Sequence, residues 1–177
     1  MSIATMKCSL KKNSRASSIT ASIRSRGRFT AAARVARPAA YLLPPQYAPL
    51  AGLLRLQGVV VERLAAPWQG RVEAFTVDSL QAAPFVFEGH RTVTLSGGWA
   101  PRDAEIPSGW FYISTDQRAG VLAACLLEPS SEDGFGTWNY YDRELRRGAE
   151  APVFRLRAPA SVPRIGWERP AESAGLE

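Results

Sequence analysis

The stretch Ala119-Gly-Val-Leu-Ala-Ala-Cys-Leu-Leu-Glu-Pro-Ser-Ser-Glu-Asp-Gly-Phe-Gly-Thr-Trp-Asn-Tyr-Tyr-Asp142 holds three parts of the fold in one run. It begins with nine apolar residues, which is typical of a buried helix. Pro129 ends this helix, because proline cannot continue the backbone hydrogen bonds. An acidic turn and then an aromatic cluster follow. The run therefore predicts a helix, a shaped loop and an aromatic contact with the core, in that order.

The helix expected before Pro129 has its own start and its own buried face. Thr115 lies where an N-cap side chain would satisfy free backbone N–H groups. Cys125 is predicted to be a buried thiol rather than the disulfide partner of Cys8, which lies in a very different segment. The apolar residues that recur at helical spacing, and that we expect to be buried, are Val121, Leu122, Cys125 and Leu126.

Strand patterns and turn residues surround this run. Pro44 and Pro45 open an earlier helix, and Gly58 is its expected stop. Gly97-Gly98 and Pro107-Ser108-Gly109 are predicted turns. The predicted strands are residues 39–43, 59–64, 72–77, 91–95, 110–114 and 152–156.

These elements predict a single α+β domain, residues 38–157, in which a mixed β-sheet carries two main helices. Residues 1–36 are rich in Ser and Arg. We expect them to form a disordered basic tail, because so few large apolar side chains cannot offset the entropy of ordering. Residues 158–177 are polar and contain prolines, and we expect a flexible C-terminal tail.

The N-terminal tail admits three interpretations. We favour a passive extension without function. An acid-free start rich in Arg and Ser also resembles an organelle transit peptide. A basic disordered arm is also able to bind nucleic acid or another anionic surface. The run Ile3-Ala4-Thr5-Met6 is too short for a secretory signal and is followed by charge, which favours a cytoplasmic location.

Charge is distributed unevenly along the chain. Residues 1–37 contain nine basic and no acidic residues, whereas the remainder contains thirteen basic and sixteen acidic residues. The net charge of +6 therefore belongs to the tail, and it gives no reason to expect that the domain binds nucleic acid. No apolar run approaches the ~20 residues that a membrane span needs, so we expect no membrane span.

Four ordered motifs lie between residues 37 and 157. Together they resemble the C-terminal region of bacterial zinc carboxypeptidases of the M14 family. The motifs are Pro38-x-x-Tyr41-Leu-x-Pro44 with Gly58-Val-x-Val-Glu-Arg63-Leu64; Phe87-Glu-Gly-His-Arg91 with Val93 and Trp99; Pro107-x-Gly109 with Gln117; and Leu126-Leu-Glu-Pro129 with Asp133, Trp138, Asn139 and Asp142.

The resemblance implies a part of such a protein rather than the whole. In that family a preceding domain holds zinc through two histidines and a glutamate, and one coordination position stays open for water. His90 is the only histidine of this chain, so we expect no cofactor here, zinc only in a parent catalytic domain, and no activity in isolation. The implied role is a non-catalytic accessory domain, separated from its peptidase by truncation or a split gene.

Two kinds of partner follow from that role. One is an M14-like catalytic domain. The other is a second copy, because a detached module should expose the apolar patch on which its neighbour packed. The alternative function is a stand-alone binding module whose basic N-terminal arm finds an anionic partner. Such binding would weaken steeply with salt.

We expect structural roles for the motif residues. Glu128 ends a helix, where the dipole disfavours a carboxylate, so an arginine or a backbone N–H elsewhere should hold it. Asp133 should shape the turn, and residues 138–142 should plug the core. The motif residues are Tyr41, Gly58, His90, Arg91, Gln117, Glu128, Pro129, Asp133, Trp138, Asn139 and Asp142.

Chemical alternatives exist for the same residues. His90 is a conceivable lone metal ligand, although one imidazole without partners defines no chemistry. Glu128 and Asp133 could form the acid/base pair of a hydrolase, if both lined one open cleft. The aromatic residues from Trp138 to Tyr141 could stack on a sugar or a base.

Overall fold

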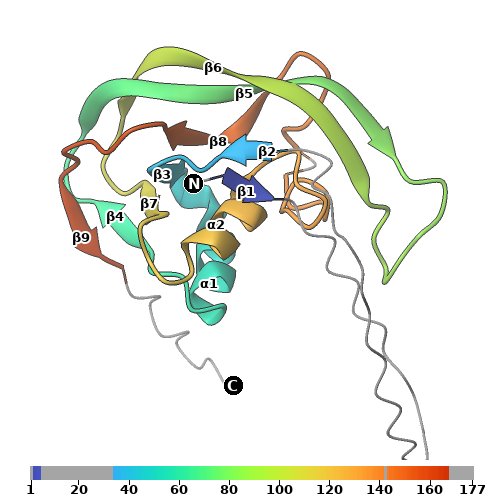
Figure 1. The fold of residues 1–177 in the computed structure, drawn as a ribbon, viewed down its shortest axis with the longest axis horizontal. Helices are drawn as coiled ribbons and strands as arrows, with labels where there is room; N and C mark the ends of the chain where they lie inside the picture. Colours follow the sequence, from blue (N-terminus) through green and yellow to red (C-terminus); the bar gives the residue numbers. More distant parts are fainter. Residues whose placement is uncertain (1, 5–33, 142, 168–177) are drawn as a thin grey trace, which may run out of the picture.

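Seven strands build the main sheet, in the order β6-β5-β8-β3-β7-β4-β9 (Figure 1). The computed structural model describes residues 2–4, 34–141 and 143–167. With two helices, the sheet forms the predicted single α+β domain. The strands are β3 (Ala40–Leu43), β4 (Glu62–Leu64), β5 (Trp68–Ala82), β6 (Val93–Ile106), β7 (Phe111–Ser114), β8 (Glu150–Leu156) and β9 (Arg164–Gly166).

All ladders between these strands are antiparallel, so the prediction of a mixed sheet is wrong in this respect. β3 and β4 run in the same direction, but β7 lies between them and pairs with both. The helical segment between β3 and β4 is thus a crossover between non-adjacent strands. Because a third strand fills the gap, each neighbouring pair can be antiparallel.

The first helical segment follows the prediction closely. β3 leads into a 3-10 turn, η1 (Pro45–Tyr47), and then into α1 (Ala48–Leu56). Pro45 lies in the first turn of η1, where its missing N–H leaves no hydrogen bond unmade. Gly58 has a φ of +81°, the left-handed conformation that glycine adopts after a helix, so the predicted stop is confirmed.

The second helix, α2 (Gly120–Leu127), ends just before Pro129, as expected, but begins later than predicted. Thr115 is buried and does not cap it. Its hydroxyl donates to the carbonyl oxygen of Pro38 at 2.5 Å, which ties the chain before β3 to the end of β7. A Cβ on Gly120 would lie 1.8 Å from the Thr115 carbonyl oxygen, so only glycine allows this close approach.

The predicted buried stripe of α2 is also wrong. Val121 and Leu122 are 53% and 38% exposed, whereas Ala123, Ala124 and Leu127 are buried. The helix is apolar all round, so its sequence does not favour one face over another. The helix packs against the sheet through the face that carries Ala123 and Ala124, because these small side chains let it approach closely.

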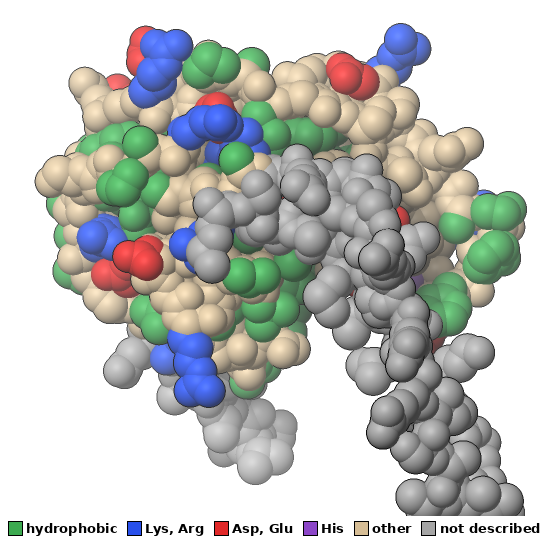
Figure 2. Space-filling model, viewed as in Figure 1, with side chains coloured by type: hydrophobic (Ala, Val, Ile, Leu, Met, Phe, Trp, Pro, Cys, Tyr) green, Lys and Arg blue, Asp and Glu red, His purple; other side chains and the backbone are tan. Residues whose placement is uncertain are grey.

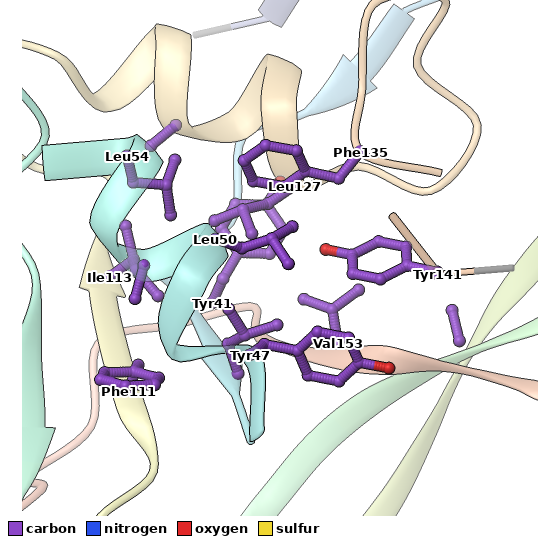
Figure 3. Packing of buried hydrophobic residues seen from close by; sticks show 14 of the residues in the cluster. Tyr41, Tyr47, Leu50, Leu54, Phe111, Ile113, Leu127, Phe135, Tyr141 and Val153 are labelled. Atoms are coloured by element: carbon purple, nitrogen blue, oxygen red, sulfur yellow. The ribbon is translucent and has the colours of Figure 1, made fainter. Parts of the chain in front are cut away.

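Both helices lie on the same face of the sheet and complete the larger of two apolar clusters (Figure 3). Leu50 and Leu54 of α1 and Leu127 of α2 pack there against strand residues such as Tyr41 and Ile113. A smaller cluster lies on the opposite face of the sheet and includes Leu42, Val72 and Leu156. The strands thus bury both faces, which explains why all four residues of β3 are buried.

The fold extends beyond the predicted boundary at residue 157. β9 pairs with β4, and Trp167 packs edge-on against Phe111 with ring centroids 4.8 Å apart. Val162 is also buried. Two of the three prolines that suggested a flexible tail, Pro159 and Pro163, lie in the connection before β9, and this short strand is at the edge of the sheet. Residues 168–177 lie outside the described residues.

A second, separate sheet pairs β1 (Ser2–Ala4) antiparallel with β2 (Arg34–Ala36). Both strands fall in the segment for which disorder is predicted, and Ile3 and Val35 are register partners in this ladder. The prediction for residues 5–33, including any role as a basic arm, lies outside the described residues. Neither helix of the described chain is long and apolar enough to cross a membrane.

The predicted turn at Gly97-Gly98 is wrong, because both glycines lie inside β6. They pair with Val77 and Thr76 of β5 in a long two-stranded hairpin that arches over the molecule (Figure 1). A Cβ on Gly97 would lie 2.1 Å from the Thr76 carbonyl oxygen and 2.7 Å from the Phe75 ring. Here glycine marks a close approach inside a strand rather than a turn.

The two neighbouring glycines provide a matched test of this interpretation. We expect Gly97→Ala to lower the free energy of unfolding by about 1–3 kcal/mol, since strand and ring must move apart. Gly98→Ala should change it by less than about 0.5 kcal/mol, because its Cβ would meet nothing within 4 Å. Urea denaturation of both variants measures the difference. Equal effects would show that the close approach at Gly97 does not matter.

Candidate functional site

Five side chains from five separate segments meet at one place between the sheet and α2. We call them the buried charge network. Side chains along a strand point alternately to its two faces. This alternation places Tyr41, Glu73 and Arg155 on the face that the helices cover, where Phe75 and Val153 also lie. The members are Tyr41 of β3, Glu73 of β5, Trp99 of β6, Glu128 after α2 and Arg155 of β8.

Glu128 is the centre of the network, and both of its carboxylate oxygens accept hydrogen bonds. Oε1 accepts from the Tyr41 hydroxyl at 2.7 Å and from Arg155 at 3.3 Å. Oε2 accepts from the Trp99 indole N–H at 3.1 Å. The arginine partner that the helix-dipole argument expects is therefore Arg155, which comes from the last strand before the C-terminal connection.

Arg155 connects two carboxylates. Its Nε donates to Glu73 at 2.5 Å, its Nη1 donates to Glu128, and its guanidinium lies 4.3 Å from the centre of the Trp99 ring. The Arg155 side chain is only 7% exposed, so solvent screens these contacts weakly. Arg157 lies 3.9 Å from the other oxygen of Glu73 but is largely exposed. The surface arginine partly balances the second negative charge.

Tyr41 acts as a donor in this network. Burial, and then the neighbouring Glu128 carboxylate, raise the pKa of the Tyr41 phenol far above its ordinary value. The phenol therefore stays protonated and donates its hydrogen to Glu128. The network has a hydrogen-bond donor or a positive charge opposite each oxygen of Glu128, which is the condition under which a buried carboxylate is tolerated.

Two cavities touch the network. The one that Arg155 lines, together with Glu73 and Arg157, measures about 60 Å³, enough for a few water molecules. The other, of about 360 Å³, is lined by Glu73 but by neither Glu128 nor Arg155. Asp133 is exposed on the loop beyond α2, whereas Glu128 is buried. The structure therefore does not place Glu128 and Asp133 in one open cleft, as an acid/base pair would require.

Gln117 links two segments that are distant in sequence. Its Oε1 accepts from the Val60 N–H at 2.7 Å, and its Nε2 donates to the carbonyl oxygens of Val60 and Ser114 at 3.1 and 2.6 Å. The side-chain amide thus imitates a backbone partner for residue 60. This contact joins the chain before β4 to the end of β7, and a structural role for Gln117 stays a prediction.

The His90 motif forms a tight turn at the end of the β5–β6 hairpin. Glu88 and Gly89 have φ values of 49° and 82°, as in the two-residue turns that close hairpins. Phe87 and His90 exchange backbone hydrogen bonds across this turn. His90 is exposed, and its ring lies edge-on to Trp138 at 5.7 Å. We predict a strand-entrance histidine, and the structure places it at the hairpin turn.

Asn139 holds the base of this turn. It has a φ of 69°, a conformation that asparagine tolerates better than most residues, and its Nδ2 donates to the Arg91 carbonyl oxygen at 3.0 Å. Through this bond the loop after α2 contacts the segment that begins β6. Arg91 itself is exposed, so its backbone rather than its guanidinium makes the contact.

The aromatic cluster divides between core and surface. Tyr141 is fully buried and packs edge-on against Tyr47 of η1, with ring centroids 5.5 Å apart (Figure 3). Tyr140 is 44% exposed and contacts Phe135 from outside. The predicted plug is therefore mainly Tyr141 with Phe135. Pro129 is buried as well, and Asp142 lies outside the described residues.

Three members of the network, Glu73, Trp99 and Arg155, do not appear among the predicted site residues, although Trp99 belongs to one of the quoted motifs. The sequence does carry a signal for Glu73 and Arg155. Glu73 lies at a spacing of two from the apolar Phe75, and Arg155 lies at the same spacing from Val153, so each charged residue shares a strand face with apolar ones. A charged residue on the apolar face of a strand needs a buried partner of opposite charge. The sequence pattern alone does not identify which acidic residue pairs with which basic residue.

No cluster of three or more His, Cys, Asp or Glu side chains that could hold a metal ion occurs among the described residues. The half-buried Cys125 thiol has a pKa above its ordinary value, first because of burial and then because of Asp133 and Glu128. A raised pKa disfavours the thiolate that a nucleophile or a metal ligand requires.

Comparison with known proteins shows that part of this sequence is similar to carboxypeptidases. The chain is 31% identical over 121 residues to Carboxypeptidase 2 of Trichophyton equinum and of Trichophyton rubrum, which is 68% of this chain and 22% of each relative. Probable carboxypeptidase 2 of Arthroderma benhamiae is 32% identical over 97 residues, 55% of this chain and 18% of the relative. No family model and no solved structure matches the chain.

These relatives support the resemblance only in part. The matched region of this chain is carboxypeptidase-like in sequence, but the chain spans only about a fifth of the length of the curated relatives that it matches. The relatives are fungal, so the similarity does not support the bacterial proteins named in the sequence resemblance.

Proposed function

We propose that this domain is a non-catalytic accessory part of an M14-type zinc metallocarboxypeptidase. The observation that carries the proposal is the partial match: 121 residues of this chain correspond to 22% of proteins named carboxypeptidase 2. The remaining part of such relatives is then expected to hold the zinc and the peptidase chemistry.

The arrangement of the acidic residues supports a non-catalytic role. A zinc peptidase needs several metal ligands around an open coordination position and a carboxylate that can take a proton from the bound water. Glu128 is a poor candidate for that base, because three donors occupy its two oxygens and it is 7% exposed. His90, the one histidine, lies at an exposed hairpin turn.

The proposed role is to stabilise and shape the peptidase on which the domain packs. The buried charge network ties β3, β5, β6 and β8 to the loop after α2, so these segments form one rigid support. A rigid support is what a neighbouring domain needs in order to hold its own loops in a productive geometry.

A domain exchange tests this proposal. In Carboxypeptidase 2 of Trichophyton rubrum, the segment that matches this chain is either deleted or replaced by the matching residues of this chain. We expect deletion to abolish soluble, active enzyme and replacement to restore peptide hydrolysis, since the accessory role depends on the shared fold. Release of the C-terminal amino acid from a peptide, with zinc present, measures activity.

The controls separate folding from function. The parental enzyme gives full activity, and the exchange carrying Arg155→Met tests whether rescue needs an intact network. This chain alone, assayed with zinc, is expected to release no amino acid. An active deletion variant would contradict an accessory role, and activity of this chain alone would contradict a non-catalytic one.

A further inference from the structure

The outer half of the β5–β6 hairpin leaves part of an apolar face uncovered. β8 pairs with β5 only between Glu73 and Thr76, so the hairpin continues beyond the sheet as two strands (Figure 1). Ala82 pairs with Val93, and Leu80 pairs with Leu95. Val93 and Leu95 are buried, but Leu80 is 39% exposed. The β6 side of this face is therefore covered and the β5 side is not.

The covering element is the loop that follows α2. Its Thr137 carbonyl oxygen accepts from the Val93 N–H at 3.0 Å, and a Cβ on Gly136 would lie 2.8 Å from Leu95. Gly148 and Ala149 exchange backbone hydrogen bonds with Val77. The loop is thus attached at both ends of the hairpin segment, and the space between these attachments remains open.

This open space is a groove. It consists of two cavities of about 520 and 670 Å³ that share Leu80 and Leu145, each within the range of small-ligand sites. Val93 and Leu145 give it an apolar floor. The hairpin tip at one end carries Phe85, Val86 and Phe87, which are 66%, 60% and 53% exposed. Figure 2 shows apolar side chains gathered at this tip.

The charges on the groove have mostly one sign. Among the described residues, three arginines and one aspartate line it: Arg91, Arg146, Arg147 and Asp78. This basic surface contrasts with the rest of the chain after residue 37, where acidic residues outnumber basic ones. A second copy docking symmetrically through the same groove would bring arginines together. Charge complementarity therefore favours an acidic partner.

We propose that this arginine-rimmed groove binds an extended acidic peptide segment that anchors apolar side chains at Leu80 and at the hairpin tip. The two cavities suit alternate side chains of an extended chain, and the arginines suit carboxylates between them. The proposal goes beyond the accessory role and does not depend on it, because residues of this chain line the groove without any from a neighbouring domain.

Peptide binding by the full chain tests the proposal. The probe is a short fluorescent peptide of glutamate and leucine, and its counterpart has lysine in place of glutamate. We expect saturable binding of the acidic peptide that weakens with salt, and no binding of the basic one. The double variant Arg146→Glu with Arg147→Glu should weaken binding about tenfold or more, and Leu80→Ser should weaken it severalfold.

Arg118→Glu is the control, because Arg118 is an exposed arginine before α2 that lines neither cavity of the groove. It should bind like the unaltered chain, and circular dichroism should show all variants folded. Binding that survives both groove variants would belong to the basic N-terminal residues and overturn the proposal. Absence of acidic-peptide binding would also overturn it. So would single-stranded DNA that binds as tightly and loses binding with the same double variant.

Discussion

Replacing Arg155 by methionine is expected to lower the free energy of unfolding by about 3–5 kcal/mol, as for other buried ion pairs that lose one partner. The substitution keeps most of the side-chain volume but removes the charge that faces both Glu73 and Glu128. Two carboxylates then remain close together with little solvent. This loss is a large fraction of the stability of an ordinary domain, and equilibrium urea denaturation measures it.

Arg157→Met is the matched control for this variant. Arg157 carries the same charge and contacts the same Glu73, but it is 66% exposed and 3.9 Å away. Exposed pairs contribute at most about 1 kcal/mol, so we expect a change within that value. Similar effects of the two substitutions would show that burial of the network is not what makes Arg155 important. An Arg155→Met protein as stable as the parent would show that the network contributes little.

The second large effect is expected for Tyr141→Ala. The Tyr141 ring is fully buried and contacts Tyr47 and Phe135, so its removal leaves a cavity between η1 and the loop after α2. We expect the free energy of unfolding to fall by about 3–5 kcal/mol, the usual cost of removing a buried aromatic ring. Thermal unfolding followed by circular dichroism, together with urea denaturation, measures the change.

The neighbouring tyrosine provides the control. Tyr140 also contacts Phe135, but from the surface, so Tyr140→Ala should cost only about 1 kcal/mol. Tyr141→Phe keeps the ring and should retain most of the stability. If Tyr140→Ala cost as much as Tyr141→Ala, the aromatic plug would be organised around the outer ring rather than the buried one.

The candidate site was predictable only in outline. The helix-dipole argument shows that Glu128 needs a distant partner, and the structure supplies Arg155, Trp99 and Tyr41. The identity of these partners depends on which strands become neighbours. β8 lies between β5 and β3, so Arg155 comes beside Glu73, 82 residues away in sequence. No local pattern contains that information.

The groove was beyond prediction for a similar reason. The sequence shows apolar residues, and three arginines that come from two distant segments, Arg91 from one and Arg146 and Arg147 from the other. They form one surface only because the hairpin extends past β8 and the loop after α2 covers one of its strands. The length of β5 and β6 itself was hidden, because Gly97 and Gly98 are typical of a turn.

The sequence by itself determined the local conformations: the helix that opens at Pro45, the left-handed stop at Gly58, the helix that ends before Pro129 and the turn at Gly109. These features depend on the φ angles and hydrogen bonds of a few adjacent residues. The tertiary structure alone decided the order of the strands, the buried face of α2 and the partners of Glu128. These depend on packing between segments far apart in the chain, because an evenly apolar helix or a lone buried charge can be satisfied from more than one direction.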